Sequence, residues 1–370
     1  MGILIPIILV VISSFIIWRA SNGFDHASSF LGRNLTEGVK GATINAISSS
    51  IPELLTSIFF LIYLKDSEGF SAGLGTIAGS AVFNAIVIPA LSIIVVIYYG
   101  ISKTIEVSKK VIYRDSIALI TLQIVLIFII YFQLLNIIGG TILVSLYLIY
   151  LIYMIYMIKS MKAKSVTSTN YYNDIQYINV KNRIISFLKL DLSYALIGNE
   201  KTTNTRAVIL LLTSLLFMGA SCLVLVWACE LIGEKEYSLF GYKNLKGLNI
   251  PISVVAIIIA AAATSIPDTI LSVKDALKGN YNDAISNAIG SNIFDIGFAL
   301  GFPILVYSIL YNPIILSEIV QEFTLEIMTI LLILTLITFI ILISNKKIGL
   351  VRGLLLLGLY FIFISYILLN

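Results

Sequence analysis

Apolar runs long enough to cross a lipid bilayer recur along the whole chain and constrain its fold more than any other feature. Hydrophobic residues make up 59% of the sequence and charged residues only 12%. A soluble domain with so few charges would be unusual, and about 20 consecutive apolar residues are typical of a transmembrane helix. We therefore predict an all-α polytopic membrane protein embedded in the lipid bilayer.

The apolar runs predict ten transmembrane helices. They cover residues 2–28, 37–64, 71–99, 116–135, 138–158, 206–232, 249–276, 281–311, 318–343 and 350–369. Five precede a long polar connection and five follow it, which divides the chain into residues 1–158, a cytoplasmic linker 159–205, and residues 206–370. An odd number of spans per half makes the second half enter the membrane upside down, so we expect two inverted-topology five-helix repeats.

The placement of lysine and arginine predicts the orientation. Of the 24 basic residues, only Lys65, Lys235, Lys243 and Lys246 fall on the side opposite to the linker. Basic residues concentrate on the cytoplasmic side of membrane proteins, so we predict a cell-membrane protein with both termini outside. The net charge of +4 follows from this bias and does not indicate a nucleic-acid partner. The later part of the linker is either an amphipathic helix on the inner membrane face or a solvated connection.

One polar motif occurs twice inside the apolar runs. Residues 48–57 and 263–272 align without a gap at an offset of 215, and share the pattern [Ser/Thr]-Ser-Ile-Pro-[Glu/Asp]. Pro52 and Pro267 each remove a helical amide donor, so we predict that helices 2 and 7 are broken there. The carbonyls of residues 46–49 and 261–264 should then lose helical partners, and lipid tolerates this only where protein, water or an ion satisfies them.

A polar stripe follows each copy of the motif. The stripes are Thr76, Ser80 and Asn84 in the first half and Asn287, Ser291 and Asp295 in the second. Their spacing places the three residues of each stripe on one helix face. With Glu53 and Asp268, the two halves supply three carboxylates, several hydroxyls and freed carbonyls, which are the oxygens that hard cations bind. Either motif alone could be a simple kink with back-bonded hydroxyls, but an acid after proline in both halves favours a cation site.

At these residues the sequence resembles the cation/calcium exchanger superfamily, and within it the sodium/calcium exchangers. The second half carries the more specific match, Thr264-Ser265-Ile266-Pro267-Asp268 together with Gly290-Ser291-Asn292-Ile293-Phe294-Asp295. Its two aspartates look most like the potassium-dependent branch. The first half departs from the family pattern, with Ser48 and Ser49 where glycine and threonine are common. The motifs themselves cover about residues 42–90 and 257–303.

The resemblance implies a role for each position. Glu53 and Asp268 would be the central calcium ligands, joined by backbone oxygens at Ser49 and Thr264. Asn84 and Asp295 would occupy the equivalent middle positions of the two halves. Sodium would share the two acids and use the remaining oxygens, those of Ala46, Ala261, Ser50, Ser265, Ser80 and Ser291.

We therefore hypothesise an antiporter that exchanges sodium for calcium by alternating access. Calcium and sodium are its transported ions, with potassium as a further candidate, and we expect no cofactor and no obligate protein partner. A calcium/proton antiporter of the same superfamily is the nearest alternative, and a cation channel is another. We expect no enzyme, because the Tyr-Asp and Gly-x-Gly-Asp motifs of intramembrane aspartyl proteases are absent.

Overall fold

The computed structural model describes residues 2–33, 44, 46–64, 67–160, 180–198, 202–239, 241–345 and 347–369. Eight of the described helices are long and apolar enough to cross a membrane, and one bent helix pair meets the same test. In the first half of the chain, Ile51–Leu64 is a shorter apolar helix, and residues 34–43 before it lie outside the described part. A helical membrane-type fold is therefore confirmed, and the count of ten spans in an inverted repeat remains a prediction.

The first half of the chain forms α1 (Leu4–Leu31), α3 (Ala46–Ser49), α4 (Ile51–Leu64), α5 (Ser67–Val82), η2 (Phe83–Val87), α6 (Ile88–Tyr98), β1 (Ile105–Glu106), α7 (Lys109–Tyr131) and α8 (Ile137–Ser160). The connection contains α9 (Val180–Leu188) and α10 (Leu192–Leu196). The second half forms α11 (Asn204–Gly233), β2 (Glu236–Leu239), β3 (Tyr242–Lys246), α12 (Ile252–Val255), η3 (Ala256–Ala260), α13 (Ala261–Thr264), α14 (Ile266–Leu277), α15 (Tyr281–Phe294), η4 (Asp295–Leu300), α16 (Gly301–Leu310), α17 (Glu318–Ile343), β4 (Lys347–Ile348) and α18 (Leu350–Leu369).

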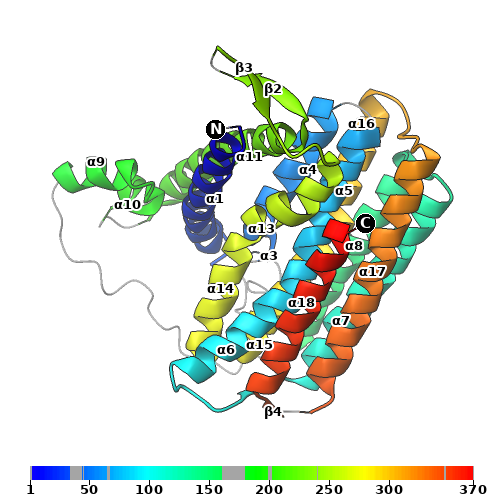
Figure 1. Ribbon diagram of the computed structural model, residues 1–370. Helices are drawn as coiled ribbons and strands as arrows, with labels where there is room; N and C mark the ends of the chain where they lie inside the picture. The colour runs from blue at the N-terminus through cyan, green and yellow to red at the C-terminus, as the bar shows by residue number, and fades with distance from the viewer. Residues whose placement is uncertain are drawn as a thin grey trace.

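Most of the helices form an upright bundle, and α1 and α11 lie together at one side of it (Figure 1). The continuous helices α5–α6 and α15–α16 lie at the centre and are the most buried of the candidate spans, because α7, α8, α17 and α18 cover them. Helices α1 and α11 pack mainly against each other. This arrangement places the polar motifs in the middle of the molecule.

Both predicted breaks occur next to the prolines. Ser265 separates α13 from α14, and the two sides of this span are bent by 43°. In the first half, Ser50 separates α3 from α4 in the same way. Pro52 and Pro267 lie in the first turn of the second half-helix, a position where a missing amide donor costs little.

Three π-helical segments lie within the helices that carry the motifs and stripes, and they were not predicted. Segment η2 contains Asn84, η4 begins at Asp295, and η3 precedes α13. Segments η2 and η4 end shortly before Pro89 and Pro303, which cannot donate to the preceding turn. Such insertions in a helix are common at functional sites, because they turn side chains away from the regular helical register.

Short β-ladders join the loops at the two ends of the bundle. Strand β1 pairs with β4 through Ile105 and Ile348, and this ladder connects a loop of each half of the chain. Strands β2 and β3 form a hairpin, where the Tyr237 hydroxyl donates a hydrogen bond to the Gly2 carbonyl. The all-α prediction therefore holds for the bundle but missed these ladders in the loops.

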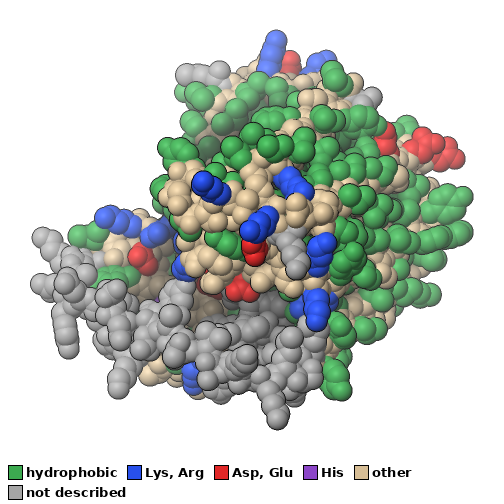
Figure 2. Space-filling model, turned by 90° about the horizontal axis from the view of Figure 1, so that it is seen from below, with side chains coloured by type: hydrophobic (Ala, Val, Ile, Leu, Met, Phe, Trp, Pro, Cys, Tyr) green, Lys and Arg blue, Asp and Glu red, His purple; other side chains and the backbone are tan. Residues whose placement is uncertain are grey.

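The described part of the linker contains a helix with one apolar face. On α9, Ile184 and Leu188 are exposed, and the Arg19 guanidinium of α1 donates to the Lys189 carbonyl at 3.1 Å. The described part of the linker is therefore attached to the middle of α1 through Arg19. Seen from below, where β4 lies, lysine and arginine side chains gather on the face of the bundle, and apolar side chains lie above and to the right of them (Figure 2).

Candidate ion-binding site

Two buried acids lie at matching positions of the broken helices. Glu53 is in the first turn of α4 and Asp268 is in the first turn of α14, and both side chains are 0% exposed. Helix N-termini carry partial positive charge, which favours a carboxylate there. The breaks at Ser50 and Ser265 therefore create the two N-termini that hold the acids inside the bundle.

Ser80 connects the two halves at the centre of the site. Its hydroxyl donates to Glu53 Oε1 at 3.3 Å and is hydrogen-bonded to the Ser265 hydroxyl of the other half at 2.8 Å. The Asn84 amide donates to Ser80 Oγ at 3.4 Å and to Asp268 Oδ2 at 3.2 Å. The first stripe thus contacts the acids of both halves.

Each acid accepts a hydroxyl from its own half and lies near a hydroxyl of the other half. The Ser291 hydroxyl donates to Asp268 Oδ1 at 2.8 Å, and the Ser49 hydroxyl also interacts with Asp268. Glu53 interacts in the same way with Thr264 of the second half. Because Ser80 is hydrogen-bonded to Ser265 and Asn84 to Asp268, the two halves form one shared site.

Several oxygens in this site have no hydrogen-bond partner in the described structure. They are Glu53 Oε2, both carboxylate oxygens of Asp295, Asn84 Oδ1 and Ser50 Oγ. The Ser50 and Ser80 hydroxyls interact electrostatically with Asp295 without completing a hydrogen bond. Buried oxygens are nearly always partnered, so this concentration of free acceptors is what an oxygen-coordinated cation would satisfy.

The backbone prediction is wrong for two carbonyls. The Ala46 carbonyl accepts the Ser50 amide at 3.2 Å, and the Ala261 carbonyl accepts the Ser265 amide at 3.0 Å. Ser49 and Thr264 hydroxyls also donate to these two carbonyls. The helical turn before each break therefore stays closed, because the missing proline amide affects the carbonyl four residues earlier, at Ser48 or Ala263.

Two stripe residues lie outside the shared hydrogen-bond network. The Thr76 hydroxyl donates back to the Ala72 carbonyl at 3.1 Å, and the Asn287 amide donates to Ser272 Oγ at 3.1 Å. Asn292 was not predicted as a functional residue, yet its amide donates to the Ala81 carbonyl of the other half at 2.9 Å. Its place beside Ser291 in the motif was the signal that could have identified it.

The described residues contain no group of three or more histidine, cysteine, aspartate or glutamate side chains compact enough to hold one metal ion. The three acids therefore do not form a single carboxylate cage. A cation bound by two of them would need hydroxyl, amide or carbonyl oxygens to complete its coordination, and the site supplies all three kinds. Cys222 and Cys229 are buried free thiols.

A buried, oxygen-lined site where two broken helices meet in a membrane-type bundle is typical of ion-transport proteins. The sodium/calcium exchanger protein family matches residues 5–156 and 206–369, and the chain belongs to this family. The family consists of exchangers, not enzymes, in agreement with the sequence analysis.

Curated relatives match over part of the chain. The sodium/potassium/calcium exchanger 2 of Mus musculus is 29% identical over 153 residues, which are 41% of this chain and 21% of that protein. The sodium/potassium/calcium exchanger 5 of Homo sapiens is 40% identical over 96 residues, 26% of this chain and 17% of that protein. These matches therefore span only about a fifth of each relative's length.

Solved structures share the fold along nearly the whole chain. An H+/Ca2+ exchanger, CAX, superimposes with a TM-score of 0.68 at 14% identity and covers 96% of this chain and 81% of its own. The sodium-calcium exchanger NCX_Mj superimposes with a TM-score of 0.56 at 23% identity and covers 98% of both chains. The fold is thus common to exchangers with different coupling ions.

Proposed function

We propose that this protein is a secondary active antiporter that exchanges sodium for calcium by alternating access. The observation that carries the proposal is the shared site, in which the Ser80–Ser265 and Asn84–Asp268 hydrogen bonds join the two halves while five neighbouring oxygen atoms have no hydrogen-bond partner among the described residues. Such a site is negatively charged and shielded from solvent, so it would cross the low-dielectric barrier only when loaded with cations.

Calcium would bind between Glu53 and Asp268, with backbone oxygens at Ser49 and Thr264. Asn84 and Asp295 would take the equivalent middle positions. Sodium would use the two acids together with the oxygens of Ser50, Ser265, Ser80, Ser291, Ala46 and Ala261. The Ala46 and Ala261 carbonyls retain a second lone pair beside their helical bond, so this role is compatible with the closed turns.

The proposed topology has ten spans as two inverted repeats, residues 1–158 and 206–370, joined by the cytoplasmic linker 159–205. The chain would lie in the cell membrane with both termini outside. The basic face seen from below supports this orientation, because positive charge concentrates on the cytoplasmic side (Figure 2). Helices α1 and α11, which pack mainly on each other, would move across the remaining bundle to change access.

A calcium/proton antiporter is the second candidate, and the fold shared with CAX favours it. Calcium uptake into proteoliposomes separates the two. Vesicles loaded with sodium and diluted into sodium-free buffer should take up calcium, and an imposed pH gradient without sodium should not drive uptake. If the pH gradient drives calcium uptake and sodium has no effect on it, the coupling ion is the proton and not sodium.

Asp295→Asn should change the response of uptake to potassium more than it weakens calcium binding. Both Asp295 oxygens are unpartnered, but this acid belongs to the second stripe rather than to the central pair. We expect calcium affinity to fall about tenfold, and any stimulation of uptake by potassium to disappear, because ligand charge sets cation affinity. Uptake with and without external potassium measures this. An unchanged potassium response would remove Asp295 from the proposed ion site.

A further inference from the structure

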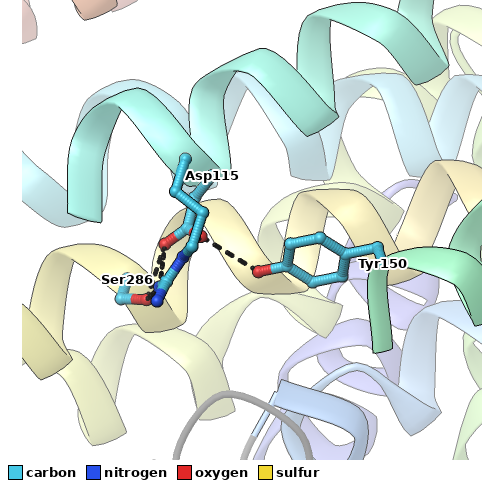
Figure 3. A network of polar contacts seen from close by, with 4 residues as sticks. Asp115, Tyr150 and Ser286 are labelled. Carbon is cyan, nitrogen blue, oxygen red and sulfur yellow. Dashed lines mark hydrogen bonds and ion pairs between the residues drawn. The ribbon is translucent and has the colours of Figure 1, made fainter. Parts of the chain in front are cut away.

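A second buried carboxylate centre lies outside the ion site. Asp115 on α7 is 0% exposed, although it lies just outside the predicted span 116–135. Both of its oxygens are bound, and Figure 3 shows Tyr150 and Ser286 pointing at its carboxylate. We call Asp115, Arg114, Tyr150 and Ser286 the α15 clamp, because Ser286 belongs to the helix that carries the second stripe.

The clamp has a complete set of donors. Arg114 donates from Nε to Asp115 Oδ1 at 2.5 Å and from Nη2 to Oδ2 at 2.8 Å. The Tyr150 hydroxyl of α8 donates to Oδ1 at 3.1 Å, and the Ser286 hydroxyl of α15 donates to Oδ2 at 2.8 Å. A carboxylate with four donors has little left to offer a cation, in contrast to the free oxygens of Asp295. The geometry therefore indicates a positioning role and not a second ion site.

Helix α15 has two polar faces, and the clamp holds one of them. Asn282 and Ser286 lie four residues apart on the first face. Asn282 Oδ1 accepts the Ser108 amide at 2.6 Å, just before α7 begins, so both residues join α15 to the start of α7. Ser291 lies on the other face, five residues beyond Ser286, and Asp295 follows directly after α15 as the first residue of η4. Because a helix turns as a rigid unit, fixing the first face fixes the direction of the second.

We infer that Asp115 is a positioning residue that sets the rotation of α15 and thereby aims Ser291 and Asp295 at the shared ion site. This inference rests on the proposed function for its effect on ion binding. The buried ion pair and its hydrogen bonds tie α15 to α7 and α8, which would form the static part of the transporter while α1 and α11 move. Charge-assisted hydrogen bonds of this kind are strong and geometrically specific.

The chain offers a matched control at the other end of the bundle. The Tyr366 hydroxyl of α18 donates to the Glu326 carboxylate of α17, so this pair also consists of an acid and a tyrosine on neighbouring helices. Neither α17 nor α18 carries a proposed site residue, and Glu326 is exposed. Glu326→Gln removes the same kind of charge without touching α15.

The test uses the purified full chain in detergent and two measurements. Hydrogen–deuterium exchange follows the amides of α15, and equilibrium calcium titration follows the ion site. Asp115→Asn should speed exchange along α15 and weaken calcium binding about tenfold, since hydrogen bonds to charged groups have effects of this size. Ser286→Ala should also speed exchange along α15 and weaken calcium binding, but by less. This variant tests the inference if Asp115→Asn does not fold. Glu326→Gln should change neither.

Unchanged exchange along α15 in both clamp variants would overturn the inference, whatever happens to calcium. Faster exchange with unchanged calcium affinity would also overturn it, because the clamp would then stabilise the fold without aiming the ligands. If wild-type protein binds no calcium, the proposed function fails, and the exchange measurement still decides whether Asp115 holds α15 in place.

Discussion

Glu53→Gln should abolish sodium-dependent calcium uptake while leaving the protein folded. Glutamine has nearly the same shape as glutamate, so it should fit a site where the side chain is 0% exposed. It also keeps a side-chain oxygen that can accept the hydrogen bond from Ser80. It removes one negative charge from the pair formed with Asp268, which interacts with it electrostatically. We expect calcium affinity to fall by about a hundredfold or more, because the charge of the ligand set controls calcium affinity over several decades.

Without ions, the unfolding temperature of Glu53→Gln should be no lower than that of wild type. A neutral group in place of a buried unpaired charge removes the cost of desolvating that charge and its repulsion from Asp268. Glu106→Gln is the control, since Glu106 is 63% exposed and lies in the β1–β4 ladder. Its uptake should equal that of wild type. A folded Glu53→Gln protein that takes up calcium at the normal rate would remove Glu53 from the site.

Gly79→Ala should separate the two halves at the centre of the site. A Cβ at Gly79 would overlap the Ile257 carbonyl oxygen and lie 2.7 Å from Ala261 Cβ, so α5 would have to move away from η3 and α13. Overpacking of this kind typically costs about 1–3 kcal/mol of stability. The shift would also pull Ser80 away from Ser265, whose hydroxyls are 2.8 Å apart.

We therefore expect Gly79→Ala to lower both the thermal stability of the purified protein and its calcium affinity. Gly219→Ala on α11 is the matched control, because no atom lies within 4 Å of a Cβ there. That change should be neutral or stabilise the protein by up to about 1 kcal/mol, since alanine is the better helix former. Equal behaviour of the two variants would show that the close approach at Gly79 is not required.

The sequence predicted the parts of the site that depend on chain-local chemistry. The duplicated proline motif indicated both helix breaks, and the structure places Glu53 and Asp268 at matching half-helix starts. The stripe spacing indicated that Ser80 and Asn84 share a face, and they contact the acids of both halves. These features follow from proline geometry and helix periodicity, which a sequence carries directly.

What the sequence missed depends on tertiary packing. The π-helical segments that contain Asn84 and Asp295 were not predicted, because the nearby Pro89 and Pro303 do not by themselves distinguish a π-helical turn from a simple kink. Asp115 follows an arginine next to the predicted span 116–135, and the sequence analysis assigned it no role. Only the approach of α8 and α15 buries it and supplies the Tyr150 and Ser286 hydroxyls. The count of ten spans stays a prediction, because residues 34–43 lie outside the described part.

The central claim is that calcium and sodium occupy one site shared by the two halves. Calcium binding to the purified wild-type chain, titrated at a series of sodium concentrations with ionic strength held constant by choline, tests this most directly. The account predicts that sodium raises the apparent dissociation constant for calcium without reducing the number of calcium ions bound at saturation. If sodium instead leaves calcium affinity unchanged, or lowers the saturating amount alone, the two ions do not compete for one site and the account is contradicted.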